Sequence, residues 1–128
     1  MRKVLPILIP VLCAIAVFLL LRTFFLLGYV PTESMEPTLK KGSYILGVRV
    51  YEELRVGDIV VFEQDQRMRV KRIAAGPGDM IERNGKTITV PADCYYMLGD
   101  NPTNSFDSRF WNEPFIENKD IIAKLLLP

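Results

Sequence analysis

Hydrophobic positions divide this chain into two unlike parts. Residues 4 to 21 are 18 consecutive positions without a charge, and after Arg22 and Thr23 the apolar character resumes over residues 24–27. At ~1.5 Å rise per residue, a helix over the uncharged run is about 27 Å long, close to the thickness of a bilayer's hydrocarbon core. The pattern therefore predicts a short N-terminal tail and a membrane-spanning helix within residues 1–28, followed by a second region over residues 29–128.

Two other interpretations of the apolar segment fit less well. A helix in the core of a soluble domain is amphipathic, whereas this segment is apolar on all sides. A cleaved signal peptide has a hydrophobic region of about 7–15 residues followed by a small-x-small site. The run here is longer, and the sequence LRTFFLLGYV that ends it contains no such site. We therefore expect an uncleaved, single-pass anchor. Arg2 and Lys3 favour a cytoplasmic N-terminus, although Lys40 and Lys41 weaken that bias.

The pattern changes to that of a β protein after residue 29. Short runs rich in β-branched and aromatic residues alternate with turn-forming residues. The expected strands are residues 44–50, 58–63, 68–75, 80–83, 86–90, 95–98 and 121–127. Asn84 and Gly85 between two of these runs are typical of a two-residue hairpin. We expect a mainly β protein, in which the transmembrane helix precedes a small all-β domain built as packed sheets or a partly open barrel.

Composition removes several classes of function. The chain has 16 basic and 15 acidic residues, so it lacks the surplus of positive charge typical of nucleic-acid binding. It contains no histidine, which excludes a Ser-His-Asp triad and every histidine-containing metal site. Cys13 lies in the expected anchor and Cys94 in the expected domain, so we expect no disulfide between them. We expect no metal, no cofactor and no nucleic-acid partner.

Ser34 is the first residue with candidate chemistry. It lies in the segment PTESMEPTL, between Pro31 and Pro37, which predicts a loop or an irregular strand rather than a central strand. Taken alone, a serine in such a loop is most simply part of a polar turn. The segment is informative only if a base lies close to it.

Lys71 is the candidate base, within RMRVKRIAAGPGD at residues 67–79. Strand alternation alone allows this lysine to face either solvent or the interior. A lysine withdrawn from water has a pKa below its usual value of about 10.4, and its neutral amine can then accept a proton from a serine hydroxyl. A third segment, GDNPTNSFDSRFW at residues 99–111, by itself predicts a capped surface loop with a weak ion pair between Asp107 and Arg109.

Together these segments resemble the signal peptidase I family of membrane-anchored serine proteases over nearly the whole chain. The matching segments, in family order, are SMEPTL at 34–39, GDIVVF at 57–62, VKRI at 70–73 leading into GPGD at 76–79, and GDN at 99–101 with NSFDSR at 104–109. Four matched segments in the same order form a specific signal. The resemblance implies a type I signal peptidase that removes signal peptides from translocated preproteins.

The resemblance also implies a role for individual residues. Ser34 attacks the scissile carbonyl to form an acyl-enzyme, and Lys71 acts as the general base, a recognised variant of the triad. Ser105 matches the family serine that orients the lysine amine, while Asp107 and Arg109 match a pair that supports the loop. The backbone N–H of Ser34 and the hydroxyl of Thr32 match the oxyanion hole.

Substrate contacts are likewise implied by the resemblance. An extended peptide adds as a strand, and shallow pockets accept small residues at the first and third positions before the cleavage point. The residues at matching positions are Val30, Pro31, Met35, Leu39 and Val70. The expected partners are signal-peptide-bearing preproteins and the lipid bilayer, near the secretion translocon, with the catalytic domain outside the plasma membrane. Arg69 departs from the apolar or aromatic residue frequent in the family, and the large inserted domain of some members is missing.

Three alternatives stay open at this point. A specialised Ser-Lys protease that matures pilins or other secreted proteins has the same catalytic segments and different pockets. A membrane-anchored module that binds signal sequences without cutting them would have the peptide groove but no catalytic activity. A self-cleaving cytosolic repressor shares the Ser-Lys chemistry, but the anchor argues against it.

Overall fold

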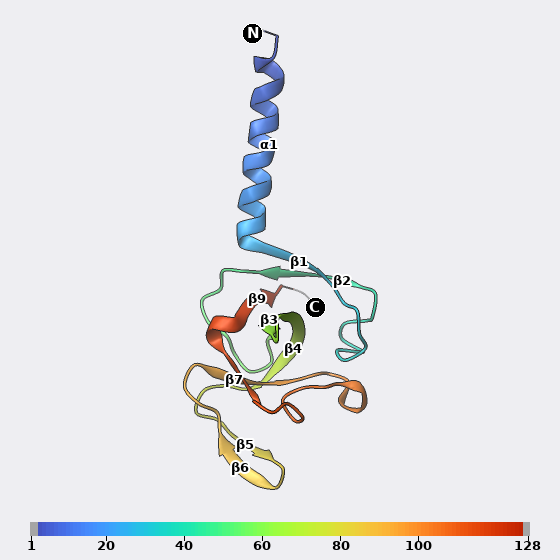
Figure 1. The fold of residues 1–128 in the computed structure, drawn as a ribbon, viewed down its shortest axis with the longest axis vertical. Helices are drawn as coiled ribbons and strands as arrows, with labels where there is room; N and C mark the ends of the chain where they lie inside the picture. The colour runs from blue at the N-terminus through green and yellow to red at the C-terminus, as the bar shows by residue number, and fades with distance from the viewer. Residues whose placement is uncertain (1–2, 127–128) are drawn as a thin grey trace.

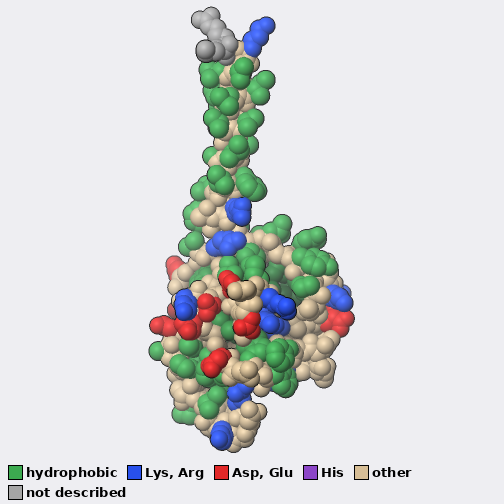
Figure 2. Space-filling view, in the orientation of Figure 1, with side chains coloured by type: hydrophobic (Ala, Val, Ile, Leu, Met, Phe, Trp, Pro, Cys, Tyr) green, Lys and Arg blue, Asp and Glu red, His purple; other side chains and the backbone are tan. Residues whose placement is uncertain are grey.

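A long helix stands on a β domain in the computed structural model, which describes residues 3–126 (Figure 1). Helix α1 (Leu5–Phe24) begins with Pro6 in its first turn, where a missing N–H costs no hydrogen bond. None of its residues is buried against the domain, and Figure 2 shows hydrophobic side chains along its length. Among residues 3–126, α1 is the one helix that is long and apolar enough to cross a membrane. A helix that is apolar all round requires an apolar environment.

The helix ends earlier than the expected anchor. We predicted an anchor that extends to residue 28, whereas Phe25 already begins strand β1 (Phe25–Tyr29) with no loop between them. All five residues of β1 pair with β2 (Tyr44–Val48), from Phe25 opposite Val48 to Tyr29 opposite Tyr44. The hydrogen bonds to β2 satisfy the backbone N–H and C=O groups that a further helical turn would otherwise have paired. An apolar sequence that could form either helix or strand therefore forms a strand here.

One antiparallel sheet forms most of the domain, which confirms the predicted mainly β fold. Its strand order is β1-β2-β9-β3-β4-β7-β8, and it does not close into a barrel. The remaining strands of the sheet are β3 (Ile59–Gln64), β4 (Arg67–Ala75), β7 (Cys94–Leu98), β8 (Phe115–Glu117) and β9 (Ile121–Leu125). Strands β5 (Met80–Arg83) and β6 (Lys86–Thr89) form a separate hairpin. Its turn residues Asn84 and Gly85 have φ of 53° and 74°, which confirms the predicted two-residue turn.

Strand β3 is buried on both faces and separates two hydrophobic clusters. Ile59 and Val61 join a cluster with Leu26, Met35 and Leu39, whereas Val60 and Phe62 join a cluster with Ile73, Met97 and Trp111. Such a strand reads as a continuous apolar run rather than an alternating one. Strand β4 pairs directly with β3, with Lys71 opposite Val60. A lysine therefore lies next to the best-packed strand of the domain.

Candidate active site

Two buried apolar residues that follow Ser34 in the sequence hold it in place. It lies in the irregular segment between β1 and β2, and only 8% of its surface is exposed. Its neighbour Met35 and, one turn later, Leu39 are buried in the cluster under β1, and the Leu39 N–H donates to the Met35 carbonyl at 2.8 Å. Burying these two side chains fixes the loop and presents the Ser34 side chain to β4.

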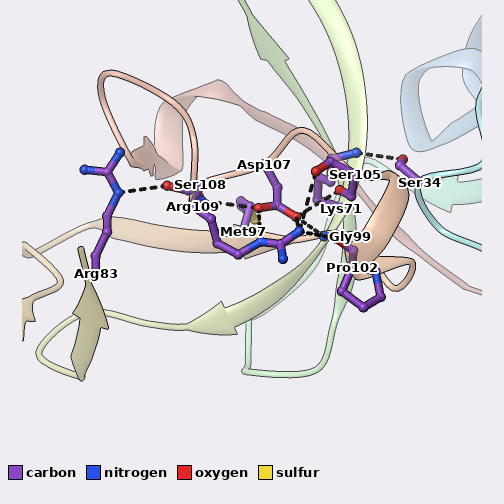
Figure 3. A network of polar contacts seen from close by, with 10 residues as sticks. All are labelled: Ser34, Lys71, Arg83, Met97, Gly99, Pro102, Ser105, Asp107, Ser108 and Arg109. Atoms are coloured by element: carbon purple, nitrogen blue, oxygen red, sulfur yellow. Dashed lines mark hydrogen bonds and ion pairs between the residues drawn. The ribbon is translucent and has the colours of Figure 1, made fainter. Parts of the chain in front are cut away.

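Lys71 reaches Ser34 from strand β4. Its Nζ lies 2.7 Å from the Ser34 Oγ, and the side chain is buried (Figure 3). Burial lowers the pKa of Lys71 to about 8; the negative charge of Asp107 acts in the opposite direction, and the positive charge of Arg69 lowers it further. A substantial fraction of this lysine is therefore a neutral amine at mildly basic pH, within hydrogen-bonding distance of a hydroxyl.

Thr32 lies beside the same hydroxyl. Its Oγ1 is 3.3 Å from the Ser34 Oγ. The two residues are separated by Glu33 alone, so the loop presents two hydroxyl groups in one direction. The structure therefore places the Thr32 hydroxyl next to that of Ser34, while its part in an oxyanion hole stays a prediction.

Asp107 is the centre of the third segment. Its side chain is fully buried, and it accepts hydrogen bonds from the Gly99 N–H at 3.0 Å, the Ser105 hydroxyl at 2.9 Å and the Arg109 Nε at 2.8 Å. Burial raises the pKa of Asp107, but the bonds from Arg109, Gly99 and Ser105 outweigh it and hold the pKa below its usual value. This carboxylate stays ionised and joins the loop to the end of β7 (Figure 3).

Ser105 lines the same cavity as Ser34 and Lys71, but its hydrogen bond is to neither of them. Its hydroxyl donates to Asp107, and among the described residues no hydrogen bond joins it to Lys71. The Ser105 oxygen keeps lone pairs free to accept a bond while its proton points to Asp107. Figure 3 shows the order Ser34, Lys71, Ser105 and Asp107 across the site.

Two cavities meet at the serine and the lysine. The first, which we call the groove cavity, has a volume of about 400 Å³ and is lined by Val30, Pro31, Met35 and Val70. Leu39 is not among its lining residues and lies in the core below. The sequence did not indicate the further lining residues of this cavity, which include Leu26, Ile45, Arg49 and Met68. The second, the loop cavity, has a volume of about 630 Å³ and is bordered by Asn104, Ser105, Phe106 and Phe110.

The chain is similar to known proteins over most of its length. A family model described as "Signal peptidase, peptidase S26" matches residues 2–90 and 84–128. The chain belongs to this family. Membership confirms the resemblance, and together with α1 it indicates a membrane-anchored protein of a serine peptidase family.

Three signal peptidase relatives show how far the similarity extends. "Probable signal peptidase I-1" of Synechocystis sp. is 30% identical, covering 92% of this chain and 79% of that protein. "Probable signal peptidase I-2" of the same organism is 29% identical, covering 75% and 59%. "Inactive signal peptidase IA" of Staphylococcus aureus is 34% identical, covering 67% and 52%. The chain thus spans between about half and four-fifths of these relatives' lengths.

The segments that resemble the signal peptidase family meet in space. Arg72, next to Lys71, binds both carboxylate oxygens of Asp100 at 2.8 and 2.6 Å and donates to the Gly57 carbonyl at 2.7 Å. The Asn101 N–H in turn donates to the Ser34 carbonyl at 2.9 Å. These contacts join the lysine strand, the serine loop and two glycine turns. Sequence reasoning assigned none of these bonds, although the GDN segment at residues 99–101 carries most of them.

The backbone at position 99 passes so close to Ser34 and Ser105 that only glycine fits there. A Cβ at this position would lie 2.6 Å from the Ser34 carbonyl oxygen and would overlap the Ser105 side chain. Asn101 and Asn104 hold the other side of the loop, because their amides donate to the Glu33 carbonyl and carboxylate at 3.1 and 2.7 Å. In the part of the chain that the structure describes, no cluster of three acidic, cysteine or histidine side chains suits a metal ion.

Proposed function

We propose that this chain is an active type I signal peptidase, in which a Ser34/Lys71 dyad removes signal peptides from translocated preproteins. The observation that carries the proposal is the 2.7 Å contact between the Lys71 Nζ and the Ser34 Oγ, both in buried side chains. The pKa of Lys71, lowered to about 8, supports it, because a neutral amine is the form that can accept a proton. Family membership supplies the substrate class.

In the acylation step, the Lys71 amine takes the hydroxyl proton of Ser34 while the Oγ bonds to the scissile carbonyl carbon. The tetrahedral intermediate then collapses, the C–N bond breaks, and the Lys71 ammonium returns the proton to the leaving amine. In deacylation, the neutral amine of Lys71 takes a proton from water, and the hydroxide attacks the carbonyl carbon of the ester. The new carboxyl end of the signal peptide leaves, and Ser34 regains its proton.

The surrounding residues support these steps. The Ser34 N–H and the Thr32 hydroxyl stabilise the oxyanion. Ser105 forms no hydrogen bond with Lys71 in the described structure, but its oxygen is free to accept one, and we propose that it orients the lysine amine in this way during the reaction. Asp107 and Arg109 hold the loop that carries Ser105. The groove cavity binds the peptide as an added strand, with small side chains at the first and third positions before the cleavage point. Four of its lining residues, Val30, Pro31, Met35 and Val70, are apolar, which suits apolar side chains such as alanine.

The membrane environment follows from α1 and the adjoining sheet edge. Side chains on the outer face of β1 and β2 are exposed and apolar, and they continue from the end of the helix. They are Phe25, Leu27, Tyr29, Tyr44 and Leu46. We place this face against the bilayer surface, with the N-terminus cytoplasmic, the domain outside the plasma membrane, and the site near the translocon exit. Ser34, five residues after β1, then lies where a signal sequence leaves the membrane.

A non-catalytic role is the second candidate, because one relative carries the name "Inactive signal peptidase IA". The contact between Ser34 and Lys71 favours catalysis over that alternative. A specialised maturation protease differs in substrate rather than in chemistry, and a panel of pilin precursors beside ordinary preproteins separates the two.

Cleavage of a preprotein with a small-x-small site by the detergent-solubilised full chain tests the proposal. Ser34→Ala and Lys71→Ala are expected to lower the rate by at least about 10³-fold, as for other dyad and triad members. Ser43→Ala, at a half-buried position, and Lys40→Ala, at an exposed one, lie near the same loop, serve as matched controls and should cut like the wild type. A folded wild type that binds the precursor and leaves it uncut would establish the non-catalytic role.

A further inference from the structure

Arg69 lies where the groove cavity and the loop cavity meet. The two cavities share four lining residues, Thr32, Ser34, Lys71 and Arg69. The first three belong to the proposed chemistry, and Arg69 has no assigned part in it. Arg69 precedes Lys71 by two positions on β4, so both side chains leave the strand on the same face.

The Arg69 side chain has no partner among residues 3–126. Its Nε is buried without a hydrogen bond, and no ion pair joins the guanidinium to another described residue. A third cavity shares Arg69, Phe106 and Phe110 with the loop cavity. Four acidic residues also line it, and none of them forms an ion pair with Arg69; they are Glu63, Asp65, Glu113 and Asp120. A buried donor without an acceptor costs free energy, which a bound acceptor recovers.

The loop cavity is positively charged during the proposed reaction. Its lining contains two cationic residues, Arg69 and Lys71, and no acidic one. Lys71 must lose its proton to act as a base, whereas an arginine stays charged at any pH of interest. Arg69 is therefore the permanent cation of the loop cavity.

The direction of the substrate chain assigns the two cavities to opposite sides of the scissile bond. The groove cavity holds the residues before the bond, because it contains the apolar pocket beside Ser34. The leaving amine must lie at the Lys71 Nζ to receive its proton. The residues after the bond therefore continue past Lys71 into the loop cavity, where Phe106 and Phe110 form an exposed stacked pair with ring centroids 6.2 Å apart.

We propose that Arg69 is a specificity-determining residue that binds an acidic side chain within the first three residues after the cleavage point. The carboxylate accepts from the guanidinium that now lacks a partner, and the stacked pair of Phe106 and Phe110 packs against the apolar part of the same segment. The enzyme then prefers preproteins whose mature part begins with Asp or Glu. This inference rests on the proposed function and adds a substrate class to it.

Competition between matched precursors tests the inference. Three versions of one precursor carry Glu, Gln or Lys at the second position after the cleavage site, and a fourth carries Glu at the second position before it. The full chain in detergent cuts mixtures of two precursors, so that the ratio of kcat/KM is read directly. We expect wild type to favour Glu over Lys after the site by about fivefold, the upper size for a partly exposed ion pair. Glu before the site should give no preference.

Variants of Arg69 separate specificity from folding, because the ratio does not depend on overall activity. Arg69→Gln should remove the preference, and Arg69→Glu should invert it. Arg67→Glu, an exposed arginine on the same face of β4 that lines none of the cavities, matches the charge change and should keep the wild-type ratio. Equal ratios in wild type, or an unchanged preference in Arg69→Gln, overturn the inference. A wild type that cuts no precursor at all overturns the proposed function instead.

Discussion

Arg72 and Asp100 form a two-point ion pair that joins the strand carrying Lys71 to the loop that holds Ser34. The Nε–Oδ1 and Nη2–Oδ2 distances are 2.8 and 2.6 Å, and both side chains are partly buried. The bond from Arg72 lowers the pKa of Asp100 more than burial raises it. We therefore expect the spacing between Lys71 and Ser34, the proposed base and nucleophile, to depend on this pair.

A double-mutant cycle on Arg72→Ala and Asp100→Ala should give a coupling energy of about 1–2 kcal/mol in unfolding experiments. Each single variant should also reduce kcat, because Lys71 and Ser34 are no longer held at the same spacing. The exposed pair of Lys119 and Glu117, at 3.4 Å, is a matched control whose coupling should be close to zero. Equal coupling in both pairs would contradict a positioning role for Arg72 and Asp100.

Gly99→Ala should destabilise the protein by about 2 kcal/mol and remove most of its activity. The added methyl group meets the Ser34 carbonyl and the Ser105 side chain, and neither can move without displacing the site. Gly76→Ala is the matched control, since a Cβ there has its nearest atom at 3.8 Å. Thermal unfolding and precursor cleavage measured on both variants decide whether the close approach matters.

Cleavage activity should rise with pH and reach half its plateau near pH 8. The reason is the lowered pKa of Lys71, because kcat/KM follows the fraction of free enzyme in which the amine is neutral. A pH–rate profile between pH ~6 and 10 measures the rising limb. Lys71→Arg, which keeps the charge and never deprotonates, should be inactive throughout. A limb centred near the ordinary lysine pKa would show that burial does not tune this group.

Lys71 should make the folded state less stable at neutral pH than at high pH. Its folded pKa of about 8 lies below the value of 10.5 for a free lysine, so between these values the unfolded chain binds more protons and stability rises with pH. Compared with Lys71→Met, the wild type should therefore gain up to about 3 kcal/mol between pH 7 and 10.5. The fluorescence of the single, buried Trp111 reports denaturant unfolding. Lys40→Met, at an exposed position, should show no such pH-dependent difference.

Polar substitution of the exposed face next to α1 should reduce activity on membranes and leave it intact in detergent. Leu46 and Tyr44 are 41% and 73% exposed, and neither lines the groove cavity. The double variant Leu46→Ser, Tyr44→Ser should lower the rate severalfold in liposomes, where the face is proposed to contact lipid. Met80→Ser, at a position as exposed as Tyr44 on the separate β5–β6 hairpin, is the control. A loss of similar size in detergent would indicate a folding defect.

The sequence predicted the central strands and missed two at the edges for identifiable reasons. The apolar run at residues 59–62 and the turn at Asn84 and Gly85 are strong local signals. The sequence assigns the residues of strand β1 to the anchor because they continue the apolar run of the helix, and only pairing with β2 makes them a strand. Strand β8 has three residues, too few to show alternation, and it forms by pairing with β7.

The sequence predicts the parts of the site that are formed by particular side chains, but not the parts that are formed by backbone hydrogen bonds. Ser34 and Lys71 emerged from the family resemblance, and residue patterns alone left the orientation of Lys71 open. The bond from the Asn101 N–H to the Ser34 carbonyl involves atoms that every residue possesses, so no residue type signals it. Arg69 departs from the family pattern in the sequence, but whether its guanidinium has a partner depends on residues that come together only in the folded chain.

In the function proposed above, the direct passage from α1 into β1 couples the bilayer mechanically to the active site. A helix longer than the local hydrocarbon thickness tilts, and with no linker between Phe24 and Phe25 the sheet edge beside Ser34 tilts with it. Lipid thickness then sets the angle at which the groove meets an emerging peptide. Membranes of different composition would give one amino-acid sequence different cleavage rates without any change in its active-site residues.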